Sequence, residues 1–132
     1  MKKQFSIQWR ASKQIRKQRK FRANASFKIR HEFLSSNLSE ELRKKYFRRS
    51  FPIRKGDMVK IMRGEYKGKS GKISLIDLKK TKVAIEGIQL TRKDGTKVNI
   101  KFPASNLQIQ ELNMEDKKRM DSITKLNKET KK

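Results

Sequence analysis

The chain has 132 residues, of which 37 are lysine or arginine and 13 are aspartate or glutamate, giving a formal net charge of +24 at pH 7. This charge indicates a strongly negative partner, and nucleic acid is favoured because neutralised phosphates release counterions and so add affinity. With no cysteine and no apolar run long enough to cross a bilayer, the sequence excludes a disulfide framework and a thiolate metal site, and we expect no membrane insertion.

The N-terminal part of the chain is the most basic. Residues 1–55 carry 18 basic and 3 acidic residues, a net charge of +15, and the first acid is Glu32. The apolar residues in this arm are Phe5, Ile7, Trp9, Ile15 and Phe21. They follow no sustained helical or strand period, which favours an extended tail. Their side chains either stack on bases and enter an RNA crevice, or pack on protein. A mitochondrial transit peptide is the alternative for the arm, but its lysine content and lack of an amphipathic face argue against it.

Residues 26–50 are predicted to form one or two short helices. Ser26 is a candidate cap for a first turn that runs toward residue 34, and Ser39 is a stronger cap because two glutamates follow it. Apolar residues spaced four apart, at Leu38, Leu42 and Tyr46, predict a buried stripe. Several cations lie off this stripe and are free to meet phosphates: Arg43, Lys44, Arg48 and Arg49.

A β-rich region follows Pro52. Strands are predicted at residues 58–62, 71–76, 83–88, 97–102 and 107–112, with a possible extension over 89–92, a bulge at Gly87 and a hairpin turn at Asp94-Gly95. Five short strands joined by tight turns predict a closed, SH3-like barrel. The expected fold is mainly β with helices on both sides: a basic arm with short helices (1–50), the barrel (51–112), and a short helix and tail (113–132) that Asn113 caps.

The most informative segment is Gly56 to Ile73, two predicted strands joined by a loop rich in glycine and lysine. Glycines let the backbone approach a partner closely, and the surrounding cations suit phosphates. Tyr66 adds a flat face for an unpaired base. The segment is not an NTPase phosphate loop, because no helix follows and Gly71 precedes Lys72-Ile73 rather than a Lys-Ser/Thr pair.

This segment resembles the KOW motif of ribosomal proteins and of certain transcription elongation factors. The flanking sequences SSNLSEELRKKY (35–46) and RSFPIRKGD (49–57), together with residues 94–96 and 103–107, are similar to one ribosomal family. That family is the eukaryotic and archaeal form of the universal large-subunit protein numbered twenty-four, or twenty-six in the older eukaryotic numbering. The resemblance covers about residues 10–123.

The resemblance implies binding to large-subunit ribosomal RNA, contact with neighbouring ribosomal proteins, a place near the exit of the nascent-peptide tunnel and a role early in subunit assembly. It assigns RNA contacts to three groups. In the loop they are Arg63, Tyr66, Lys67, Lys69 and Lys72. In the segment before the first barrel strand they are Arg48, Arg49, Arg54 and Lys55. In the arm they are Arg10, Arg16, Lys17, Arg19, Lys20, Arg22 and Arg30.

Other functions fit the sequence less well. The single histidine, His31, has no acidic partner beyond Glu32, so we expect no enzyme, cofactor, metal or small-molecule substrate. A KOW-type transcription elongation factor or a chromatin-associated protein is the alternative, although the first fifty residues are too few and too charged for the α/β domain of such a factor. A ribosomal protein acts in the cytoplasm, with transit through the nucleus if the cell is eukaryotic.

Overall fold

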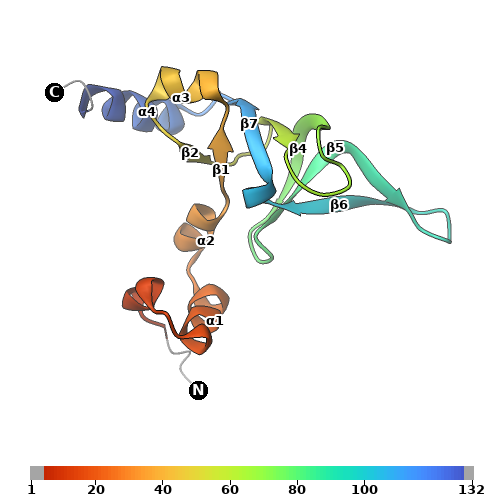
Figure 1. Cartoon of the computed structure of the whole chain (residues 1–132), viewed down its shortest axis with the longest axis horizontal. Helices are drawn as coiled ribbons and strands as arrows, with labels where there is room; N and C mark the ends of the chain where they lie inside the picture. Colours follow the sequence, from red (N-terminus) through yellow and green to blue (C-terminus); the bar gives the residue numbers. More distant parts are fainter. Residues whose placement is uncertain (1–4, 130–132) are drawn as a thin grey trace.

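The computed structural model describes residues 5–129. Within them seven strands form one sheet in the order β2-β1-β7-β3-β4-β5-β6 (Figure 1). The strands are β1 (Ser35–Leu38), β2 (Ser50–Pro52), β3 (Met58–Ile61), β4 (Ser70–Asp77), β5 (Lys82–Thr91), β6 (Lys97–Pro103) and β7 (Leu107–Glu111). The helical elements are η1 (Ile7–Ala11), α1 (Ile15–Asn24), α2 (Phe27–Phe33), α3 (Glu40–Tyr46), η2 (Ala104–Asn106) and α4 (Lys117–Glu129).

All five predicted strands are present, but the closed five-stranded barrel is not. In the described part of the chain the outermost strands, β2 and β6, do not pair, so the sheet stays open. Two strands were missed: β1 pairs antiparallel with β2 and parallel with β7. The segment of β1, SSNL, is short and polar, and it becomes a strand because Asn37 and Leu38 lie beside Gln108 and Ile109 of β7.

The core lies under the alternating apolar residues of the sheet. Val59 and Ile61 of β3 are fully buried, and Ile109 and Leu107 lie opposite them in β7. One side of each strand thus packs inward, as the two-residue period requires. The same cluster includes residues from the loops and flanking segments, namely Leu34, Ile53, Ala104 and Ile123.

A long hairpin made by β5 and β6 extends away from the rest of the sheet (Figure 1). Its register shifts between Ala84 and Gln89, which agrees with the predicted bulge at Gly87. At its tip, the Asp94 carboxylate accepts hydrogen bonds from the Thr96 amide at 3.0 Å and the Thr96 hydroxyl at 2.7 Å. These bonds lower the pKa of Asp94 and confirm the predicted turn.

The N-terminal arm is helical, so the prediction of an extended tail was wrong. Arginine, lysine and glutamine, which favour helix, make up most of α1, and residues 1–51 contain no glycine or proline. Two of the apolar residues that lack a period, Phe5 and Phe21, form a cluster with Phe33, whereas Ile7 and Ile15 stay exposed. Phe21 is 2% exposed, stacks on Phe5 at 5.4 Å between ring centroids, and meets Phe33 edge-on at 5.8 Å.

The three predicted helix caps had different outcomes. Ser26 lies at the N-cap position of α2, but its side chain makes no capping hydrogen bond. Ser39 caps α3 as expected, since its side chain accepts from the Leu42 amide at 3.4 Å. For α4 the prediction was wrong by three residues, because Asp116, rather than Asn113, accepts from the Lys118 amide at 2.9 Å. Asn113 accepts from the Glu115 amide at 3.0 Å and forms the turn before the helix. The carboxylate of Asp116 is therefore the group that faces the first turn of α4.

Candidate nucleic-acid interface

The loop between β3 and β4, residues 62–69, has a shape that its backbone holds closed. The Gly68 amide donates to the Ile61 carbonyl at 2.8 Å, and the Ile61 amide donates to the Lys69 carbonyl at 2.8 Å. Gly68 has a φ of +89°, which a residue with a Cβ rarely adopts. Because backbone bonds close the loop, its charged side chains are free to face a partner.

The exposed cations of this loop form a patch that continues onto the sheet. The predicted residues Arg63, Lys67, Lys69 and Lys72 are all exposed. Lys60, which sequence analysis missed, shares the outer face with Lys72 because Lys60 pairs with Ser70 and Met58 pairs with Lys72. Its position between the buried Val59 and Ile61 is the sequence signal that places it outward. We call Lys60, Arg63, Lys67, Lys69 and Lys72 the loop patch.

Tyr66 lies at the base of the loop patch and is half-buried. Its ring meets Phe102 edge-on at 5.9 Å, and the Lys69 ammonium lies 5.1 Å from the ring centroid. Tyr66 thus connects the loop to the core and holds Lys69 close to the sheet, a contact that strengthens when water is excluded. The geometry supports a positioning role for Tyr66 more directly than a free stacking face.

The four predicted cations before β3 have different surroundings. Arg49 and Lys55 are exposed, whereas Arg48 lies over the Phe51 ring at 5.4 Å from its centroid. Arg54 forms an ion pair with Asp116, so its guanidinium is partly committed to holding α4. Arg49 and Lys55 are therefore the two members of this group that are most open to phosphate.

In the arm, most predicted contacts point into solvent. Arg16, Lys17, Arg19 and Arg22 of α1 are exposed, and Lys20 is partly exposed. Arg30 is the exception, because its guanidinium donates to the carbonyls of Ala25 at 3.0 Å and Ala23 at 2.7 Å and so satisfies the end of α1. Arg10 pairs with Glu32 at 3.5 Å, an exposed contact of little strength.

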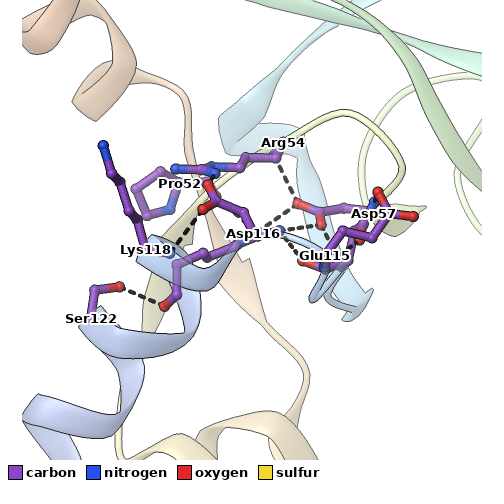
Figure 2. A network of polar contacts seen from close by, with 9 residues as sticks. Pro52, Arg54, Asp57, Glu115, Asp116, Lys118 and Ser122 are labelled. Carbon is purple, nitrogen blue, oxygen red and sulfur yellow. Dashed lines mark hydrogen bonds and ion pairs between the residues drawn. The ribbon is translucent and has the colours of Figure 1, made fainter.

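A buried ion pair was not foreseen. Asp57 and Arg119 are 0% and 2% exposed, and two bonds join them: Nη1 to Oδ1 at 2.6 Å and Nη2 to Oδ2 at 2.8 Å. The Asp57 carboxylate also accepts from the amides of Arg54 and Asn113, at 2.8 Å each. Figure 2 shows Asp57 among Pro52, Arg54 and the start of α4. The sequence signal was an acid directly before a buried strand in a basic segment.

These groups lie in two separate regions. Figure 1 shows the arm on one side of the sheet and the β3–β4 loop on another. The Asp57–Arg119 pair lies at the junction of the sheet with α4 and is buried, so its role is structural. Most of the exposed cations that the sequence predicted to contact RNA therefore belong to two basic surfaces, the loop patch and the arm.

Two other kinds of site find no support in the structure. Across the residues that are described, no cluster of three histidine, aspartate or glutamate side chains is placed to hold a metal ion. None of the helices in residues 5–129 is long and apolar enough to span a membrane.

Comparisons with known proteins give the family. Residues 12–126 match the family that comprises the eukaryotic ribosomal proteins L26 and their archaeal counterparts, the L24 proteins. The large ribosomal subunit protein uL24 of Methanosarcina barkeri is 43% identical over 114 residues, 86% of this chain and 98% of that protein. The uL24 proteins of Methanosphaera stadtmanae and Methanoculleus marisnigri are 40% and 44% identical over 114 and 112 residues, covering 86% and 85% of this chain and 97% and 93% of the relatives. The chain therefore belongs to this ribosomal-protein family, whose members are structural components of the ribosome and not enzymes.

Proposed function

We propose that this chain binds large-subunit ribosomal RNA through the loop patch and the basic arm, and that it supports subunit assembly as a structural component of the ribosome in the cytoplasm. The observation that carries this proposal is the loop patch: five exposed cations on the β3–β4 loop and the two strands beside it, with the shape of the loop set by its own backbone. A rigid array of cations binds phosphate with little loss of conformational entropy.

The family relationship supports a finer proposal about location. We infer that the chain lies near the exit of the nascent-peptide tunnel and contacts neighbouring large-subunit proteins, as its sequence resemblance implies. The three relatives described above are archaeal, and the comparisons give no support for nuclear transit, so we do not propose it. The same family match disfavours a KOW-type elongation factor or a chromatin protein.

The double variant Lys67→Glu with Lys69→Glu tests the loop patch. Reversing two charges removes two phosphate contacts and adds repulsion, so we expect affinity for large-subunit ribosomal RNA to fall about tenfold to a hundredfold at about 100 mM salt. Filter binding or fluorescence anisotropy measures this loss. Circular dichroism should show an unchanged fold, because both side chains are exposed.

A matched control is Lys93→Glu with Lys97→Glu at the tip of the β5–β6 hairpin, where both lysines are exposed. This control should lose less than about threefold in affinity, since it changes net charge equally without touching the loop patch. Equal losses in the two double variants would contradict the loop assignment. Sedimentation of the tagged protein with the large subunit, through dissociation at low magnesium, tests the ribosomal location independently.

A further inference from the structure

A groove of about 780 Å³ lies between the N-terminal arm and the sheet. One wall is formed by η1 and α1, and the other by the turn between β4 and β5 and by the segment from Pro103 to Ser105. In Figure 1 the β4–β5 turn extends from the sheet toward the side where the arm lies. Segments far apart in sequence thus form one concave surface.

The cations of this groove come from both walls. Arg10, Arg19 and Arg22 line the arm side, and Lys79 of the β4–β5 turn lines the sheet side. Among the described residues that line the groove there is no aspartate or glutamate. A concave surface with charges of one sign concentrates the field and attracts counterions of the opposite sign.

The arm wall is held in place by polar contacts. The side-chain amide nitrogen of Gln18 lies 2.9, 3.1 and 2.8 Å from the carbonyl oxygens of Trp9, Arg10 and Ser12, so it ties η1 to α1. Phe21, buried at 2% exposure, lies at the floor beside Phe33. Arg10 is thereby placed over the groove before any partner arrives, and its exposed pair with Glu32 is weak enough to be exchanged.

We propose that this groove holds a stretch of single-stranded RNA backbone, gripped between the arm and Lys79. RNA fits the observations because phosphates can meet cations on both walls while ribose and base surfaces meet the partly exposed Phe33 and Pro103. The inference rests on the proposed function and deepens it. It adds a second RNA contact, and it gives a role to Lys79, which the sequence analysis did not select.

The variant Lys79→Glu tests the groove, with a uridine oligomer of about 20 nucleotides as the RNA probe. We expect its affinity at about 100 mM salt to fall about tenfold, and the slope of log affinity against log salt to lose about one unit. Lys93→Glu on the hairpin is the matched control and should lose less than about threefold. Equal losses in the two variants, or a Lys79 effect seen only with a duplex of the same length, would overturn the proposal.

The Lys67→Glu/Lys69→Glu variant separates the two proposals. If the unchanged protein fails to bind RNA, the proposed function fails with the groove. If the loop variant weakens binding as expected and Lys79→Glu behaves as its control, the groove alone fails. Adding Lys79→Glu to the loop variant should produce a further loss of about tenfold, because the groove is a separate contact.

Chemical protection gives a second readout. The chain has no cysteine, so Ser105→Cys, on the sheet wall of the groove, introduces a single reactive thiol. We expect saturating uridine oligomer to slow its alkylation at least about fivefold, because alkylation needs solvent access. Thr96→Cys in the hairpin turn is the reference and should keep its rate. An unprotected Ser105→Cys in the presence of bound RNA would also overturn the proposal.

Discussion

The arm (residues 5–33) and the sheet (residues 35–111) keep their shapes by different interactions. In the sheet, fully buried aliphatic residues such as Val59, Ile61 and Ile109 form a continuous core. In the arm, the buried hydrophobic residues among those described are Phe21 and Ala25. Side chains such as Gln18 and Arg30 bond to backbone carbonyls and supply much of the remaining order.

This difference shows how a chain with a net charge of +24 can fold at all. The sheet carries most of the apolar burial and keeps most of its charged side chains exposed. The arm carries exposed cations on short helices and holds them with one aromatic cluster and a few polar bonds. Stability is therefore concentrated in the sheet, and the exposed charge that we propose to face RNA is concentrated at its loop and in the arm.

The largest expected effect comes from a substitution in the buried ion pair of the sheet region. Asp57→Asn leaves the Arg119 guanidinium charged and buried, and we expect the free energy of unfolding to fall by about 3–5 kcal/mol. Urea denaturation followed by circular dichroism measures the change. The pair variant Asp57→Asn with Arg119→Met should be less destabilised than Asp57→Asn alone, because no unpaired buried charge remains. If the pair variant lost as much free energy of unfolding as the two single variants together, this explanation would be refuted.

A smaller, local effect is expected in the arm. Phe21→Ala removes the ring that joins Phe5 and Phe33, so α1 should lose about 2–4 kcal/mol of protection against local opening. Hydrogen exchange of the α1 amides measures this loss. The strands should keep their protection, because Phe21 lies outside the main core cluster. A parallel loss in β3 and β7 would mean that arm and sheet unfold as one unit.

The smallest effect concerns a surface pair and contrasts with the buried one. The Lys101 ammonium lies 2.8 Å from Asp77, and this hydrogen bond, with one from the Lys80 amide, lowers the pKa of Asp77 below its ordinary 3.8. Because the pKa of Asp77 is lower in the folded state, its carboxylate stabilises the fold at pH values above the ordinary pKa. This stabilisation is lost as the pH falls through the pKa that Asp77 has in the folded state. Asp77→Asn should therefore destabilise the folded state slightly at neutral pH and should not change its stability in strong acid.

Thermal unfolding from neutral pH down to about pH 2 tests this dependence. In a Lys101→Met background, Asp77→Asn should destabilise the fold less at neutral pH, because the Lys101 hydrogen bond, the largest cause of the lowered pKa of Asp77, is already gone. A difference in stability between the unchanged chain and the Asp77→Asn variant that stays constant with pH would show that the carboxylate charge is not responsible.

Much of the fold and site followed from local pattern. Alternation and turn signals located the five strands β3 to β7, and Ser39 with two following glutamates located α3. Glycine spacing among lysines located the loop patch, and its four predicted cations are exposed as expected. Each of these features depends on neighbours within about ten residues, so a single sequence contains the information.

Tertiary structure decided what depends on distant partners. Strand β1 exists because β7 lies beside it. The Ser36 hydroxyl donates a hydrogen bond to the carbonyl of Leu107, which is 71 residues further along the chain. The Asp57–Arg119 pair joins residues 62 apart, and Lys79 meets the arm only across the groove. The sequence by itself determined the charge, the strands β3 to β7 and the loop between β3 and β4. Long-range packing decided the open sheet, the aromatic cluster of the arm and which cations are buried, because those outcomes depend on contacts that no local pattern encodes.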